Sequence, residues 1–237
     1  MRDLEVLLEV QAHDTATDQL QHRRATLSER TSLEELLQER ATGQAELKRI
    51  SGELSAAESK RTALEAEVAE ADTRISAIEG RMFGGTVTSS KELESMAAEV
   101  ASLKARRSGL EDQALEAMEA AEAVRAELDR GQQSDTTQIA AIADIQAALV
   151  ISEAEVDSLI AAEQATRAEL AATVAPELLA SYEGIRTKLG GIGAARLEGD
   201  RCTGCHLSLP SGEVERLRHE APDTVAHCDN CGRILVR

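Results

Sequence analysis

Four cysteines near the C-terminus form two pairs whose spacing suits metal binding. The first pair is Cys202-Thr-Gly-Cys205, and 22 residues later the second pair is Cys228-Asp-Asn-Cys231. Zn²⁺ takes four thiolates tetrahedrally, and each C-x2-C turn supplies two of them together with backbone amides that can bond to sulfur. A zinc ion held by four sulfurs has no open position for a substrate. We therefore predict one structural zinc ion, held by all four cysteines.

The segments around these cysteines predict a zinc ribbon over residues 192–237. Short strands are expected at "IGAARLEGDRC", "HLSLP", "TVAHC" and "RILVR". Gly204 and Gly232 lie at or after the two turns, where glycine frees the backbone. His206 and His227 flank the cysteines, but the zinc shell is already complete, so we interpret both as surface residues. Unliganded cysteines and a redox-active pair are the alternatives, and the paired spacing favours metal.

The elements that must carry this ribbon are long helices. Apolar residues recur with a 3-4 spacing from 47 to 82 and from 93 to 128, interrupted by Arg61 and Arg107. Such spacing is typical of a coiled coil. The two series mirror each other about residue 87 or 88, so residue i is expected to face roughly residue 175 − i. Each arginine stem is then expected to lie along the seam, near Ala114 and Val68 respectively.

The stretch between the two series predicts a turn at about residues 82–90. Its two adjacent glycines end the first helix, and Ser89 with Glu92 forms a capping box for the second. The predicted fold class is mainly α: a long antiparallel two-helix coiled-coil hairpin over 1–172 with a small C-terminal β zinc ribbon. The rival is a pair of helices exchanged between two chains, and the short turn favours closure within one chain.

Two interruptions are expected in the hairpin. The first arm loses its register after Leu27, and Ser32 could cap a restarted helix there. Gly43 and Gly131 fall opposite one another under the same mirror rule. We expect the hairpin to bend or loosen at these two glycines.

A linker helix is predicted within residues 173–191. Pro176 suits a first helical turn, and the Gly190-Gly191 pair suits the stop. One face of this helix should pack the ribbon onto the base of the hairpin. The residues of that face are Leu178, Tyr182, Ile185 and Leu189.

The turn holds the single phenylalanine of the chain, Phe83. Together with Met82 and Val87 it could form an apolar plug that seals the turn. Alternatively, an exposed aromatic side chain could anchor a partner protein. We expect a mixture of the two roles, weighted to the plug.

Charge and composition exclude several classes of function. The net charge of −17 lies in residues 1–180, with 18 basic and 35 acidic residues, whereas 181–237 hold eight of each. Such an acidic surface repels phosphate backbones. No apolar run is long enough to span a membrane, and acids within the N-terminal apolar stretch are not typical of a signal peptide. We therefore expect a cytoplasmic protein without a membrane partner. No catalytic grouping is visible, so we expect no enzyme.

The chain resembles a known bacterial family, the coiled-coil proteins with a C-terminal C4-type zinc ribbon. The matching pieces are "GGTVTSSKELESM", "PELLASYEGIR", "CTGCHLSLP" and "CDNCGRIL". The resemblance implies a non-enzymatic adaptor or chaperone-like protein, because studied members are linked to sigma factors, to flagellar or secretion components and in places to RNA. It also implies that the four cysteines are the metal ligands. The hairpin of this chain is strongly acidic, which disfavours direct binding to nucleic acid.

The sequence is compatible with three functions. The first is an adaptor that binds partner proteins, as a monomer or weak homodimer, through the tip and the ribbon; the candidate contact residues are Met82, Phe83, Val87, Arg216, Arg218 and Arg233. The runner-up is an RNA- or DNA-binding ribbon, with phosphate contacts from Arg196, Arg201, Arg216, Arg218, Arg233 and Arg237. The third resembles factors that insert an acidic hairpin tip into RNA polymerase. It is disfavoured because residues 81–90 contain no acid.

Overall fold

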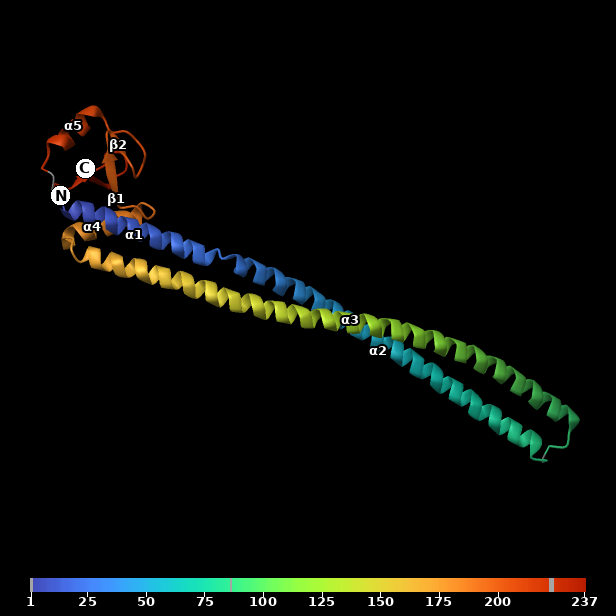
Figure 1. Cartoon of the computed structure of the whole chain (residues 1–237). Coiled ribbons are helices and arrows are strands. Elements are labelled where there is room, and N and C mark those ends of the chain that lie inside the picture. The colour runs from blue at the N-terminus through green and yellow to red at the C-terminus, as the bar shows by residue number, and fades with distance from the viewer. Residues whose placement is uncertain (1, 86, 222–223) are drawn as a thin grey trace. The chain divides into compact units, whose positions relative to one another are not determined.

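The structure is a computed structural model that describes residues 2–85, 87–221 and 224–237. Figure 1 shows the helices of the hairpin and the small ribbon. The helices are α1 (Arg2–Ala25), α2 (Ser28–Phe83), α3 (Ser90–Ala171), α4 (Pro176–Lys188) and α5 (Ser211–His219). The strands are β1 (Ala194–Glu198), β2 (Arg201–Cys202), β3 (Ala226–His227) and β4 (Ile234–Val236). Contacts group the chain into two compact units, Met1–Ser32 with Ile145–Arg237, and Leu33–Asp144.

In the unit Leu33–Asp144, α2 and α3 pack against each other in antiparallel fashion (Figure 1). Near the turn, Ile75 and Ile78 of α2 cluster with Met96 and Val100 of α3. The pairing follows the mirror rule predicted from the heptads. Ion pairs border the seam, such as Lys104 to Glu79 at 2.7 Å. The seam closes within one chain, so the predicted hairpin is confirmed.

The two arginines in the heptad series lie half-buried beside this seam. Arg107 donates to Asp72 of α2 at 2.7 Å, and the Nε atom of Arg61 lies 3.3 Å from Glu65 on its own helix. Val68 packs against the neighbouring apolar cluster. Long side chains of this kind keep their charged ends at the solvent edge while their stems stay near the seam.

The two glycines within the arms do not interrupt their helices. Helix α2 continues through Gly43, and helix α3 continues through Gly131. A Cβ atom at position 131 would lie 2.6 Å from Cδ2 of Leu47, whereas one at 43 would come no closer than 3.9 Å to Gln138. Position 131 is therefore a place of close helix packing, so the arms are not loosened there, contrary to the prediction.

The predicted restart of the first arm was placed too late. α1 ends at Ala25 and α2 begins at Ser28, four residues before Ser32. The intervening Leu27 is buried, and its carbonyl accepts a 3.1 Å bond from the backbone N–H of Arg30. Leu27 therefore lies buried in the short gap between the two helices.

In the other unit, α4 joins the base of the hairpin to the ribbon. Leu7 and Val10 of α1 are fully buried together with Tyr182 of α4 and with Ile234 and Val236 of β4. Apolar burial of this kind is the main stabilising contribution to such a junction. The predicted packing is therefore confirmed for Leu178, Tyr182 and Ile185, whereas Leu189 is the C-cap residue of α4 and lies outside this cluster. Gly190 and Gly191 follow the helix end with φ of 70° and 97°.

The ribbon is a four-stranded sheet with the order β2-β1-β4-β3. β1 and β4 pair in parallel, and the other two pairs are antiparallel. The strand expected at "HLSLP" is wrong, because only an isolated bridge joins Ser208 to Arg201. Helix α5, which follows Pro210, was not predicted from the sequence. Two apolar residues three apart, Val214 and Leu217, are the signal that could have revealed it.

No helix in the described part of the chain is both long enough and apolar enough to cross a lipid bilayer.

Candidate metal centre

The four cysteine sulfurs converge on one point in the ribbon. All lie within 4.8 Å of one another, and the Sγ atoms of Cys205 and Cys228 are 3.8 Å apart. Zinc–sulfur bonds of about 2.3 Å in a tetrahedron place the sulfurs about 3.8 Å apart. The cysteines form no disulfide. The donor set and its spacing therefore fit a tetrahedral zinc ion.

The two cysteine turns share one backbone pattern. The N–H of Cys202 donates to the carbonyl of Leu207 at 3.1 Å, and the N–H of Cys228 donates to that of Arg233 at 2.9 Å. The residue after the second cysteine of each turn is left-handed, with φ of 61° at His206 and 75° at Gly232. The chain thus builds the same metal-binding turn twice, once with histidine where glycine is favoured.

Backbone amides bond to the buried sulfurs, as predicted. The thiol of Cys202 accepts from the N–H groups of Gly204 and Cys205, and the thiol of Cys228 accepts from those of Asn230 and Cys231. Such bonds favour the thiolate form, which is the form that binds zinc.

Burial acts on these thiols in the opposite direction. Without metal, burial raises the pKa of Cys202 and raises the pKa of Cys228 to about 12. Burial also acts to raise the pKa of Cys231, but hydrogen bonds from the backbone and side chain of Arg233 and from neighbouring thiols lower that pKa to about 7. Zinc binding at neutral pH must therefore displace protons from the two buried thiols.

The small core of the ribbon is built around the cysteines. Cys202 and Cys228 are buried with Val214 and Leu217 of α5 and with Leu235 of β4. A metal ion that joins the four sulfurs would thus stabilise the whole cluster, because few other residues are available to form a core.

Arg233 holds the ribbon to the linker helix. Its guanidinium group donates to the carbonyl of Ile192 at 3.0 Å and to that of Leu189 at 3.1 Å. Its Cδ atom lies where a side chain at Gly204 would be, 2.6 Å from a Cβ placed there. Glycine is therefore needed at position 204 for close packing. The φ angle of Gly204 is not in the left-handed region, so backbone freedom is not the reason for glycine here.

The other ribbon arginines also have partners within the chain. Arg216 pairs with Glu213 and Glu220, and Arg218 approaches Glu215 at 3.7 Å. The remaining three contacts are Arg196 to Glu5 at 2.6 Å, Arg201 to the carbonyl of His206 at 2.9 Å, and Arg237 to the carbonyls of Ala221 and Thr224 at 3.0 and 2.9 Å.

The hairpin turn leaves its phenylalanine in solvent. Met82 and Val87 pack against the cluster of Ile75 and Met96, whereas Phe83 is 82% exposed. The favoured plug interpretation was therefore wrong for Phe83. Two smaller side chains seal the turn, and the aromatic ring at the end of α2 contributes little to it.

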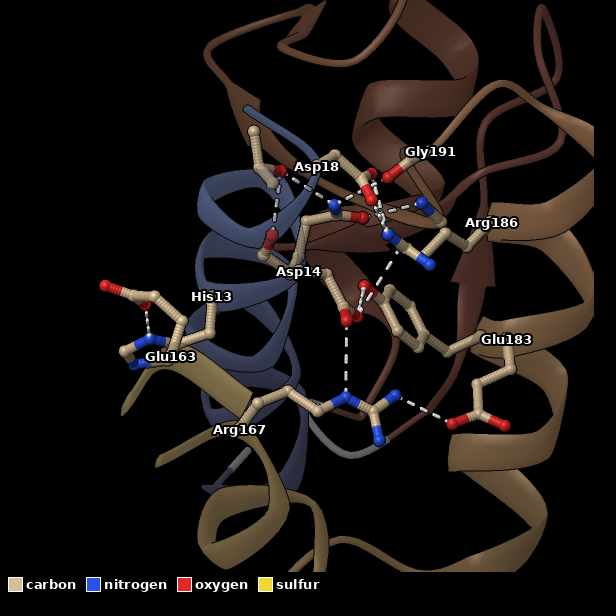
Figure 2. Close-up of polar contacts among 12 residues, drawn as sticks. His13, Asp14, Asp18, Glu163, Arg167, Glu183, Arg186 and Gly191 are labelled. Atoms are coloured by element: carbon tan, nitrogen blue, oxygen red, sulfur yellow. Dashed lines mark hydrogen bonds and ion pairs between the residues drawn. The ribbon is translucent and has the colours of Figure 1, made fainter. Parts of the chain in front are cut away.

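A buried polar cluster that was not predicted from the sequence lies where α1 meets α3 and α4 (Figure 2). The buried carboxylate of Asp14 accepts a 2.6 Å hydrogen bond from the hydroxyl of Tyr182. Arg167 of α3 donates to the same carboxylate at 3.3 Å, and Arg186 of α4 lies 3.6 Å from it. Two arginines thus offset the buried charge of Asp14, which would otherwise be costly. They also pair with two exposed carboxylates, Arg167 with Glu183 and Arg186 with Asp18, each at 2.7 Å.

Gln11 completes this cluster on the ribbon side. Its amide oxygen accepts from the backbone N–H of Gly193 at 2.6 Å, and its amide nitrogen donates to the carbonyl of Gly191 at 2.9 Å. The chain leaving α4 is therefore bonded to α1. A weak signal exists in the sequence, because Gln11, Asp14 and Thr17 share one helix face with apolar neighbours.

Comparison with known proteins matches both parts of the chain. The CT398-like coiled coil hairpin domain matches residues 10–190, and the C4-type zinc ribbon domain matches residues 201–235. Together with the sulfur geometry, the second match confirms the prediction of one structural zinc ion held in the ribbon.

Solved structures with the same fold cover nearly the whole chain. A protein from Mycobacterium smegmatis superimposes with a TM-score of 0.89 at 25% identity, covering 100% of this chain and 97% of its own. CT398 from Chlamydia trachomatis has a TM-score of 0.74 at 18% identity, over 99% and 97%. The HP0958 protein from Helicobacter pylori has a TM-score of 0.53 at 16% identity, over 99% and 97%.

Relatives in Mycobacterium tuberculosis share part of the sequence. Proteins MT2288 and Rv2229c, from two strains, are 40% identical over 98 residues. The match spans 41% of this chain and only 40% of the length of those relatives.

Proposed function

This chain belongs to the CT398-like coiled-coil hairpin family and carries a C4-type zinc ribbon, and from that premise we propose that it is a non-enzymatic adaptor or chaperone-like protein. In this proposal the hairpin (1–172) and the ribbon (192–237) each bind a partner protein, and the linker (173–191) joins them. The proposed setting is the cytoplasm, with the chain acting as a monomer or weak homodimer on transcription or secretion machinery.

The observation that carries this proposal is the exposed ring of Phe83. The chain holds one phenylalanine, and the turn is sealed by Met82 and Val87 without it. The Phe83 side chain is 82% exposed, so a partner protein that covers it would bury most of its apolar surface. We therefore place the main contact of the hairpin at Phe83, with Met82 and Val87 supporting it.

Protein partners are favoured over nucleic acid for a physical reason. The six ribbon arginines that could contact phosphate have carboxylate or carbonyl partners within the chain. Phosphate binding would have to displace these contacts. In this proposal Arg216 and Arg218, which lie on the exposed side of α5, remain candidate contacts, whereas Arg233 positions the ribbon.

The test compares proteins captured from the host by the zinc-loaded wild type, by Phe83→Ala and by a matched control, Leu115→Ala. Leu115 is also an exposed apolar residue, so its loss controls for surface hydrophobicity. We expect Phe83→Ala to lose specific proteins that the control retains. Captured proteins are then purified, and their affinity for each variant is measured.

A result in which all three proteins capture the same set would contradict the role of the hairpin turn. Binding of RNA at physiological salt by the wild type, reduced by Arg216→Ala or Arg218→Ala, would contradict the preference for protein partners.

A further inference from the structure

One face of α3 in the unit that contains the ribbon is apolar and exposed. Val150 and Ile151 expose 65% and 61% of their surface, and Leu159 exposes 48%. We use the name α3 patch for the six residues that line one shallow surface groove: Val150, Ile151, Ala154, Glu155, Ser158 and Leu159.

The α3 patch lies on the side of the helix away from the hairpin seam. Val156 is buried, and its neighbours Glu153 and Asp157 both lie near Arg24 of α1, at 3.9 and 2.7 Å. Residues two positions from Val156 point about 200° around the helix from it, because each residue turns the helix by about 100°. Ala154 and Ser158 therefore form the centre of a second face, which α1 does not cover.

The charge around the α3 patch is acidic. Within the unit that contains the ribbon, residues 145–166 of α3 contain four acidic residues and no lysine or arginine. Glu153, Asp157 and Glu163 pair with residues of the first arm of the hairpin. Glu155 is exposed on the patch, and it makes no ion pair within the described part of the chain. The α3 patch is therefore an apolar surface with one unpaired carboxylate, that of Glu155, at its edge.

We propose that the α3 patch docks a basic amphipathic helix of a partner protein. The groove between Ile151 and Leu159 receives apolar side chains, and Glu155 pairs with a lysine or arginine beside them. Helix-in-groove recognition of this kind reads apolar anchors at helical spacing and flanking charge. This surface is separate from Phe83 and from the ribbon arginines, so the inference extends beyond the proposed function.

The acidic charge of the α3 patch disfavours three other binding partners: a second copy of this chain, nucleic acid and anionic lipid. A second copy related by two-fold symmetry would present the same surface to itself, so the acidic edge would find no cation on the α3 patch of its partner. Nucleic acid and anionic lipid would meet the same acidic edge. A basic helix is the partner whose charge complements this one.

The probe is a fluorescent helical peptide with leucine and alanine at heptad core positions and lysine at the flanking positions. A second peptide carries glutamate in place of each lysine. Anisotropy titrations use the full zinc-loaded chain as wild type, as Ile151→Glu and as Glu155→Lys. The matched controls are Leu115→Glu and Glu119→Lys, which change exposed positions elsewhere on α3.

We expect the basic peptide to bind the wild type at least tenfold more tightly than the acidic peptide. Ile151→Glu should weaken binding roughly tenfold or more, and Glu155→Lys should shift the preference toward the acidic peptide. Both controls and Phe83→Ala should bind as the wild type does, which separates this surface from the hairpin turn.

Three results would overturn the proposal. One is the failure of the basic peptide to bind, and another is equal binding of both peptides. The third is a concentration-dependent dimer in light scattering that Ile151→Glu dissociates, since a second copy would then cover the α3 patch.

Discussion

At the scale of single residues, the hydroxyl of Tyr182 matters because it bonds to a buried charge. Burial, followed by the hydrogen bond to Asp14 and the charge of that carboxylate, raises the pKa of this tyrosine well above its usual range. Ionised tyrosine beside Asp14 would place two negative charges 2.6 Å apart. The bond therefore stabilises the junction of α1 and α4 only while the tyrosine is neutral.

The sign of the pH dependence follows from this shift. Because the pKa of Tyr182 is higher in the folded chain than in the unfolded one, its contribution to stability is complete below pH of about 10 and is lost as pH rises above it. The chain has one tyrosine and no tryptophan, so absorbance of tyrosinate reports this residue alone. We expect no normal titration near pH 10 in the folded chain.

A variant checks the cause of that shift. Asp14→Asn removes the negative charge, so the tyrosine pKa should move back toward its ordinary value if the junction stays folded. Circular dichroism at the same pH values distinguishes titration of the folded chain from alkaline unfolding. A normal titration in the folded wild type would contradict the buried hydrogen bond.

At the scale of elements, glycine has opposite effects in two settings. Gly52 lies inside α2 with no atom near the place of a side chain, so only its backbone freedom matters there. Gly193 precedes β1, and a Cβ there would lie 2.6 Å from the carbonyl oxygen of Tyr182. The first is a weak point of a helix, and the second is required by packing.

These settings predict opposite changes in the free energy of unfolding. Gly52→Ala should stabilise the chain by roughly 0.5–1 kcal/mol, because alanine restricts the unfolded backbone and favours helix. Gly193→Ala should destabilise it by roughly 1–3 kcal/mol through overpacking. Urea unfolding followed by circular dichroism measures both. A stabilising effect at position 193 would mean that the linker relaxes freely against α4.

At the scale of the whole molecule, the metal and the hairpin stabilise different parts of the chain. The ribbon cluster includes all four cysteines, whereas the clusters of the α2–α3 seam contain none. Helices α2 and α3 comprise 56 and 82 residues, and their seam rests on apolar burial between them. Loss of zinc should therefore affect the ribbon and spare most of the helix.

Zinc removal tests this separation. We expect a strong chelator to release about one zinc per chain and to unfold the ribbon, while most of the helical circular dichroism signal remains. Acid should have the same effect, because protons compete with zinc for the thiolates: without metal even Cys231, whose pKa is lowered to about 7, is protonated below that pH. Zinc release measured with a colorimetric chelator should therefore rise as pH falls. Complete loss of helix on chelation would contradict the separation.

Several features of this protein follow from the sequence by itself. The heptads predict the hairpin and its mirror pairing, and the two C-x2-C turns predict the tetrathiolate zinc site. Both depend on short-range rules, because a helix places residues three and four apart on one face, and a cysteine turn places two sulfurs together. Local spacing therefore determined the pairing and the metal.

Only the tertiary structure decided which polar groups are buried and which apolar groups are exposed. Asp14 and Tyr182 are 168 residues apart in the chain, so no local pattern indicates that they share a hydrogen bond. Phe83 and the α3 patch remain exposed because no described part of the chain packs over them. Burial depends on what the rest of the fold brings to a residue, and that information is not carried by its neighbours in sequence.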